Sequence, residues 1–168
     1  GCLPYEPNDG QEQALDALAA FLSSRAERPC FLLTGYAGTG KTSLVSALTQ
    51  AMQALQQPTI LLAPTGRAAK VMSHYAGVAA YTIHKWIYHS EENPLGEPSF
   101  SLGYNKDKFP LFIVDEASMI DSYLLRDLIQ FIFDGIFIIC AGCSKLFSCN
   151  YQICQFISNR SATAESPG

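Results

Sequence analysis

A glycine-rich segment that ends in lysine and threonine is the part of this sequence best suited to do chemistry. Residues 31–42 read Phe-Leu-Leu-Thr-Gly-Tyr-Ala-Gly-Thr-Gly-Lys-Thr, an apolar run leading into the pattern G-x-x-x-x-G-K-T. In such a loop the backbone N–H groups turn inward and, with the positive end of the following helix, hold phosphate groups. Lys41 supplies a point charge, and the Thr42 hydroxyl can ligate a magnesium ion. The segment therefore predicts a nucleoside triphosphate site with Mg²⁺.

The nucleotide-binding set comprises the loop and the first residues of the helix after it. Its predicted members are Gly35, Ala37, Gly38, Thr39, Gly40, Lys41, Thr42 and Ser43. A chance match of the pattern in an ordinary glycine loop is the alternative, and the apolar run before the loop with the helical pattern after it argues against that alternative.

A second chemical element lies at Asp115-Glu116, directly after the apolar run 111–114. At the C-terminal end of a strand, Asp115 can hold magnesium directly or through a water. Glu116 can orient and deprotonate the water that attacks the γ-phosphate. An isolated Asp-Glu pair can also cap the next helix, which is the alternative. Lys41, Asp115 and Glu116 are the predicted catalytic residues, and Thr42 with Asp115 are the predicted metal ligands.

Apolar strands that alternate with helices must position these two elements. Short apolar runs predict buried strands at 30–34, 59–63 and 111–114, and helical spacing predicts helices at 11–24, 41–55, 66–75, 83–88 and 122–133. The first helix is expected to be capped by Asn8 or Asp9, with Glu12 completing a capping box with Asp9. Residues 90–108, rich in Gly, Pro, Ser and Asn, predict an exposed loop. The alternation predicts an α/β fold with a parallel sheet covered on both faces.

Composition is that of a globular domain. The chain has 168 residues, 48% hydrophobic and 15% charged, with a net charge of −4. No membrane span or leader pattern is present, so a cytoplasmic location is expected, and the missing initiator Met indicates a piece of something longer. Between Glu27 and Glu91 no residue is acidic. That stretch could attract a nucleotide and also a nucleic-acid backbone, although scattered surface charges would look similar.

Four cysteines crowd into the C-terminal part, at Cys140, Cys143, Cys149 and Cys154. A Cys-x2-Cys pair resembles half of a zinc site, but the second pair has four intervening residues and follows too closely for easy tetrahedral ligation. Accident is therefore favoured over zinc.

Four ordered segments give the chain a family resemblance. They are Tyr-Ala-Gly-Thr-Gly-Lys-Thr at 36–42, Ala-Pro-Thr-Gly-Arg-Ala-Ala-Lys at 63–70, Thr-Ile-His-Lys-Trp at 82–86 and Ile-Val-Asp-Glu-Ala-Ser-Met at 113–119. In order and spacing they resemble the Walker A motif, motif Ia, the segment after it, and motif II of superfamily 1 DNA helicases of the RecD-like branch. The match covers residues 5–131 and implies a P-loop NTPase (RecA-like) fold.

The resemblance implies ATP and Mg²⁺ as cofactors and single-stranded DNA as partner. Gln13 stands where the family has its adenine-reading glutamine. The residues that resemble the family's single-strand contacts are Pro64, Thr65, Gly66, Arg67, Thr82 and His84. An ordinary helix start is the alternative at 64–67. Trp86 and Tyr88 could stack on bases, but core packing is the favoured role.

The resemblance stops after motif II, the segment at 113–119. The family has a further strand that ends in Gly-Asp-x-x-Gln-Leu-Pro, whereas residues 136–145 can form the strand but supply neither the acid nor the glutamine. We expect an ATPase domain at 1–135, then a last strand and a poorly ordered tail at 136–168 that a shifted reading frame or truncation would explain.

The second motor domain is also absent, and two domains are needed to turn hydrolysis into translocation. The interpretation is the N-terminal motor domain of a RecD-like DNA helicase, which binds and hydrolyses ATP but, as a truncated fragment, does not unwind DNA alone. A small P-loop phosphotransferase and a non-catalytic nucleotide-binding module are the alternatives.

Overall fold

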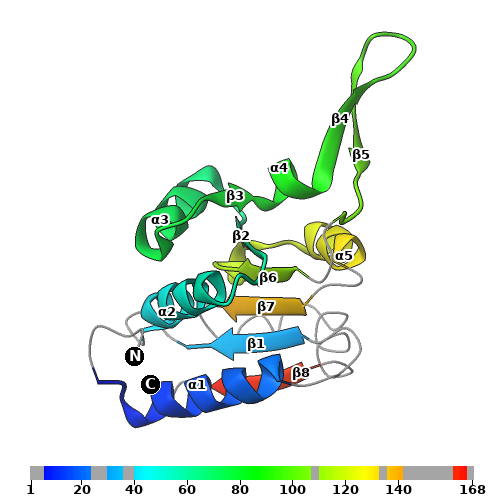
Figure 1. The fold of residues 1–168 in the computed structure, drawn as a ribbon. Helices are drawn as coiled ribbons and strands as arrows, with labels where there is room; N and C mark the ends of the chain where they lie inside the picture. The colour runs from blue at the N-terminus through cyan, green and yellow to red at the C-terminus, as the bar shows by residue number, and fades with distance from the viewer. Residues whose placement is uncertain are drawn as a thin grey trace.

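The computed structural model describes residues 6–23, 30–35, 40–106, 110–132, 136–141 and 161–165. Within them, six parallel strands form one sheet in the order β3-β2-β6-β7-β1-β8 (Figure 1). The strands are β1 Cys30–Thr34, β2 Thr59–Ala63, β3 Ala80–Thr82, β6 Leu111–Val114, β7 Ile136–Ala141 and β8 Ser161–Glu165. This arrangement confirms the predicted α/β P-loop architecture.

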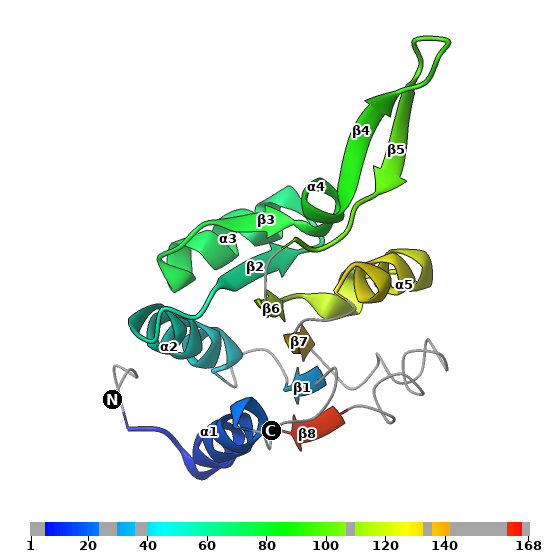
Figure 2. The same ribbon diagram turned by 45° about the vertical axis from the view of Figure 1, so that its right-hand side comes forward.

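Helices cover both faces of this sheet (Figure 2). They are α1 Asp9–Leu22, α2 Lys41–Ala54, α3 Gly66–Ala76, α4 Ile83–Ile87 and α5 Ser122–Phe131. Successive strand residues point to opposite faces, so Phe31 and Leu33 of β1 join the core under α1, α2 and α3, while Leu32 joins the core under α4 and α5. Burial on both faces explains why β1, β2 and β6 are continuous apolar runs that begin and end where predicted.

The start of α1 differs from the prediction in detail. Asn8 is the N-cap, so α1 begins at Asp9 rather than near Gln11. With the cap at position 8, the third helical residue is Gln11, and its side-chain oxygen accepts from the Asn8 N–H at 3.1 Å while Asn8 Oδ1 accepts from the Gln11 N–H at 2.9 Å. The capping-box partner is therefore Gln11 and not Glu12.

The predicted exposed loop at 90–108 is wrong, because most of it forms a projecting antiparallel hairpin. Its strands are β4 Tyr88–Glu92 and β5 Pro98–Leu102, with Tyr88 opposite Leu102 and Glu92 opposite Pro98 (Figure 1). Of the residues that suggested a loop, Asn93, Pro94 and Gly96 form the connection, whereas Ser90, Pro98, Ser99 and Ser101 lie in the strands themselves. Asn93 Oδ1 accepts from the N–H groups of Leu95 and Glu97, and Gly96 has a positive φ of 76°.

The C-terminal part adds two strands. β7 continues the sheet after residue 135 and lies between β1 and β6. β8 was not expected; it pairs in parallel with β1, with Cys30 opposite Ser161 and Thr34 opposite Glu165. Residues 142–160 and 166–168 lie outside the described part, so the predicted poor order of the tail stays a prediction there.

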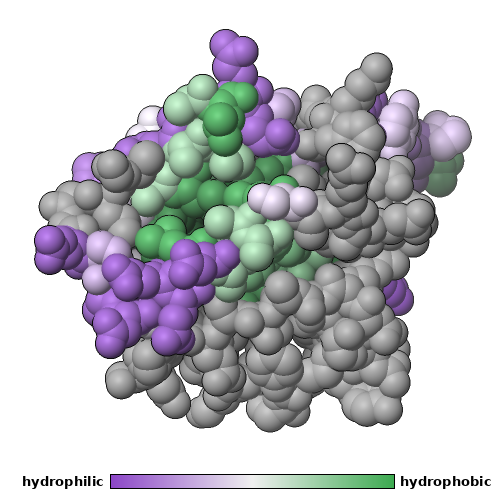
Figure 3. All heavy atoms as spheres, turned by 60° about the horizontal axis from the view of Figure 1, so that its bottom comes forward, coloured by the Kyte–Doolittle hydropathy of each residue, from purple (hydrophilic) through white to green (hydrophobic). Residues whose placement is uncertain are grey.

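One face of the molecule carries a shallow apolar hollow (Figure 3). Partly buried side chains of α1 and α2 pack against the core under these helices, namely Leu15, Ala17, Leu22, Leu48 and Ala51. Among the described residues, no helix is long and apolar enough to cross a membrane.

Candidate nucleotide and nucleic-acid site

The sheet brings the loop and Asp115 to the same edge. Val114 of β6 lies opposite Ile139 of β7, and Ile139 lies opposite Leu32 of β1. Asp115, one residue further along β6, is therefore level with Leu33, two strands away or about 10 Å. Since all these strands are parallel, the loop that begins at Gly35 and the Asp115-Glu116 pair both follow the carboxyl ends of the sheet, where α/β folds bind ligands.

The end of the loop has the backbone that the pattern predicts. Gly40 caps α2 with φ 85° and ψ 16°, a left-handed conformation that glycine adopts without a steric penalty. Lys41 follows as the first helical residue, and its Nζ donates to the buried Gly35 carbonyl at 2.6 Å. The Lys41 ammonium group thereby links the start of α2 to the residue that follows β1. Ala37, Gly38 and Thr39 lie outside the described residues.

The N-terminus of α2 differs from those of the other α-helices in the described part. Asn8, Thr65, Thr82 and Asp121 each cap their helix with a side-chain oxygen, but α2 has no side-chain cap hydrogen bond. Thr42 is exposed and Ser43 is half-buried in that turn. An anion at this end would interact favourably with the helix dipole and N–H groups.

Asp115 and Glu116 take up different environments at the end of β6. The half-buried Asp115 carboxylate accepts two hydrogen bonds, at Oδ1 from the Glu116 N–H (2.8 Å) and at Oδ2 from the Tyr75 hydroxyl (2.5 Å). Glu116 is exposed and has φ 53° and ψ 34°, an uncommon conformation for a residue with a side chain. Such backbone strain clusters at functional sites. The pair does not cap α5, whose cap is Asp121.

The donors at this edge suit magnesium rather than a softer metal. Mg²⁺ prefers hard oxygen ligands and usually combines one or two protein groups with waters and substrate phosphates. Thr42 and Asp115 supply a hydroxyl and a carboxylate, and the described residues hold no cluster of three or more His, Cys, Asp or Glu side chains that would form an all-protein metal cage. The zinc alternative at the four cysteines falls on side chains outside the described part.

The residues that resemble single-strand contacts form one continuous edge. β2 and β3 are neighbours, with Ala63 opposite Thr82, so the segments 64–67 and 82–84 emerge side by side at the carboxyl ends. Thr65 and Thr82 each use their hydroxyl to cap α3 and α4, at 3.2 Å from the Ala68 N–H and 3.3 Å from the Lys85 N–H. The exposed members are Thr65, Gly66, Arg67 and His84, whereas Pro64 and Thr82 are half-buried. Thr65 and Thr82 therefore serve as helix caps, and the exposed residues of the two segments are still accessible to a ligand.

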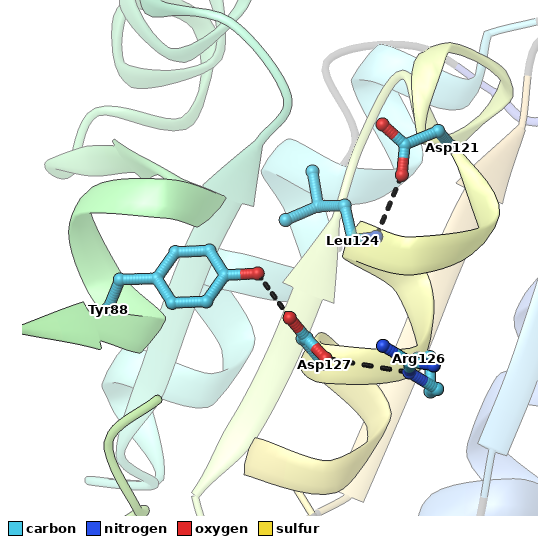
Figure 4. Close-up of polar contacts among 5 residues, drawn as sticks. All are labelled: Tyr88, Asp121, Leu124, Arg126 and Asp127. Atoms are coloured by element: carbon cyan, nitrogen blue, oxygen red, sulfur yellow. Dashed lines mark hydrogen bonds and ion pairs between the residues drawn. The ribbon is translucent and has the colours of Figure 1, made fainter. Parts of the chain in front are cut away.

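Trp86 and Tyr88 are packing residues, as favoured. Both are partly buried against the core under α4 and α5, and the Trp86 ring lies 4.8 Å from that of Tyr81. The Tyr88 hydroxyl donates to Asp127 Oδ2 on α5, while Asp127 Oδ1 lies 3.7 Å from Arg126 Nε (Figure 4). Burial, then the bond to Asp127, raises the pKa of Tyr88 to about 12. The phenol thus keeps its proton and ties the base of the hairpin to α5.

We expect Tyr88→Phe to lower the free energy of unfolding by about 1 kcal/mol, because Asp127 loses its donor. Since the folded-state pKa lies above the ordinary value of 10.0, this contribution is complete below pH 10 and disappears as pH rises toward about 12. Urea unfolding at pH 7 and across the alkaline range measures both effects. Tyr104→Phe, at an exposed tyrosine, is the control, and equal losses in the two variants would contradict the role.

The predicted adenine contact is the least supported member of the site. Gln13 is exposed on α1, so its side chain is available to a ligand. The buried glutamine of this helix is Gln11, 5% exposed, whose side chain takes part in the capping box. Tyr75 is a site residue that the sequence analysis missed, because an aromatic residue at helical spacing looks like core.

Comparisons with known proteins show the family to which the chain belongs. A family model described as an AAA domain matches residues 6–144, and so includes β7 beyond the predicted limit of 131. The chain is 27% identical over 137 residues to the ATP-dependent RecD2 DNA helicase of Deinococcus radiodurans, and 31% identical over 128 residues to the ATP-dependent DNA helicase dda of Enterobacteria phage T4. These alignments cover 81% and 73% of this chain but 18% and 28% of the relatives.

The fold has a solved counterpart as well. The crystal structure of Pif1 helicase from Candida albicans superposes with a TM-score of 0.52 at 17% identity, covering 96% of this chain and 40% of that one. At this identity the likeness concerns the fold alone.

Proposed function

The chain belongs to the AAA-domain family and is a motor-domain fragment of the superfamily 1 helicases. We propose that it binds and hydrolyses Mg-ATP, and that in the whole protein this hydrolysis drives translocation along DNA. One observation carries the proposal. The start of α2 has no side-chain cap, with Gly40 left-handed and Lys41 bonded to Gly35, and it shares the carboxyl edge of the sheet with Asp115 and Glu116. A phosphate cradle and two carboxylates at one edge are the parts that NTP hydrolysis requires.

Each residue of the site has a distinct role in this proposal. The amides at 35–43 and Lys41 hold the phosphates, Thr42 and Asp115 hold the metal, and Glu116 takes the proton of the attacking water. Bound magnesium supplies positive charge that stabilises the phosphates during transfer. Gln13 is the proposed adenine contact. The exposed position of Glu116, beside a carboxylate that is hydrogen-bonded and half-buried, supports separate roles for the two acids.

Single-stranded DNA is the proposed partner, and the edge formed by 64–67 and 82–84 is its proposed contact surface. The neighbouring positions of these segments and the exposure of Arg67 and His84 support it. Hydroxyl, amide and guanidinium groups at that edge are suited to phosphate oxygens rather than to base edges. A cytoplasmic location is part of the same proposal.

We expect these 168 residues to bind single-stranded DNA weakly and with strong salt dependence, and not to separate strands alone. Arg67→Ala should reduce the slope of log affinity against log salt by about 0.7, the value for one phosphate contact on a single strand. Fluorescence anisotropy of a labelled oligonucleotide at several salt concentrations measures the slope. Arg126→Ala removes the same charge from α5 and should leave it unchanged. Strand separation by this chain alone would contradict the expectation.

ATP turnover with and without single-stranded DNA separates the proposal from its alternatives. A motor domain hydrolyses ATP faster when DNA is present. A phosphotransferase transfers the γ-phosphate to a metabolite and ignores DNA, and a non-catalytic module binds ATP without turnover. Failure of the chain to bind Mg-ATP would exclude all three.

A further inference from the structure

Tyr75, in the last turn of α3, is hydrogen-bonded both to Asp115 and to α2, the helix that follows the phosphate loop. Its hydroxyl donates to Asp115 Oδ2 at 2.5 Å, across 40 positions of sequence. Its backbone carbonyl accepts from the Ser46 hydroxyl on α2 at 2.8 Å. The ring is half-buried against the core under α1, α2 and α3. One residue therefore joins the helix of the phosphate loop to the carboxylate proposed to hold the metal.

The two hydrogen bonds to the Asp115 side chain fix the plane of the carboxylate. Oδ1 accepts from the Glu116 N–H at 2.8 Å, and the backbone of Asp115 is itself held by its N–H bond to the Leu62 carbonyl at 3.0 Å. The Tyr75 hydroxyl restrains Oδ2. Each carboxylate oxygen can accept more than one hydrogen bond, so both keep the capacity to meet a metal ion or its water shell. Without the Tyr75 bond, the bond from the Glu116 N–H to Oδ1 would be the one that orients the carboxylate.

We propose that Tyr75 is a positioning residue of the metal site, whose hydroxyl holds the Asp115 carboxylate in the orientation that magnesium needs. The inference rests on the proposed function, because it assigns a residue to the same nucleotide site. Groups that orient a metal ligand commonly change metal affinity by 10- to 100-fold when they are removed. A tyrosine that serves only to fill the core would change stability and leave the magnesium dependence alone.

The test is the magnesium concentration needed for ATP binding by Tyr75→Phe, a variant that keeps the ring and removes the hydroxyl. We expect the midpoint of a magnesium titration, followed by binding of a fluorescent ATP analogue, to rise roughly tenfold. Binding of the same analogue in EDTA should not change, because Lys41 and the loop amides do not depend on Tyr75. Tyr81→Phe is the matched control at another half-buried tyrosine and should titrate as the unaltered chain does.

A double-mutant cycle assigns the effect to Asp115. Asp115→Asn weakens the magnesium site by itself, and in that background Tyr75→Phe should cause no further shift. A Tyr75→Phe midpoint equal to that of the unaltered chain, a lower midpoint, or an undiminished shift in the Asp115→Asn background would overturn the inference. If the unaltered chain bound no Mg-ATP, the proposed function itself would fail. If the unaltered chain bound Mg-ATP and Tyr75→Phe showed no shift, only the inference about Tyr75 would fail.

Discussion

Lys41→Ala should lower the affinity for Mg-ATP by about 100-fold, since hydrogen bonds to charged groups contribute up to about 3 kcal/mol. Lys41 begins α2 and its ammonium group already lies against the Gly35 carbonyl at 2.6 Å, so little rearrangement is needed to meet phosphates. Isothermal titration calorimetry of the unaltered chain and the variant measures the loss directly.

Lys70→Ala is the matched control for this measurement. Lys70 is an exposed lysine of α3 within the same acid-free stretch, so its removal changes the net charge equally without touching the loop. Thermal unfolding of Lys41→Ala should show that the variant stays folded, because Lys41 is not part of the apolar core. Equal affinities in the unaltered chain and Lys41→Ala would remove the claim of a nucleotide site here.

Sequence reasoning located the parts of the fold that depend on local pattern. β1, β2 and β6 are apolar on both faces and end at glycine, proline or an acid, so their bounds could be predicted residue by residue. The phosphate loop and Asp115-Glu116 follow from them, because the carboxyl ends of parallel strands meet at one edge. β7 could be predicted as a strand from its apolar run, even though its end lacks the family's polar residues.

Features that depend on distant partners were missed. The β4–β5 hairpin carries mostly exposed or half-buried residues, so no apolar face marks it and its turn residues dominate the local composition. β3 has three residues, and its pairing with β2 rather than its sequence makes it a strand. β8 is a strand because it pairs with β1, and no local sequence pattern predicts that pairing.

The same limit applies to the site. Tyr75 occupies an apolar position of a crossover helix, and only the folded chain brings its hydroxyl to Asp115. The capping role of Gln11 depends on where α1 begins, which a shift of two residues in the predicted start obscured. The positive φ of Glu116 has no sequence signal, since glutamate rarely adopts it.

Glu116→Gln and Asp115→Ala should separate binding from hydrolysis. Glu116→Gln keeps the size and hydrogen-bonding capacity of an exposed side chain that does not hold the metal in our proposal, so Mg-ATP affinity should stay within about twofold. Its loss as a general base should slow hydrolysis by about 100-fold or more, the usual contribution of such a group.

Asp115→Ala should act on binding itself. It removes the carboxylate that Tyr75 and the Glu116 N–H hold in place, and with it the proposed protein ligand of magnesium on β6. ATP binding in the presence of magnesium should fall toward the level measured in EDTA, whereas Glu116→Gln should retain the difference between the two conditions. Calorimetry in magnesium and in EDTA, combined with phosphate release in single turnover, gives both quantities for each variant. Loss of binding in both variants, or retention in both, would show that the two acids do not divide the work between metal and water.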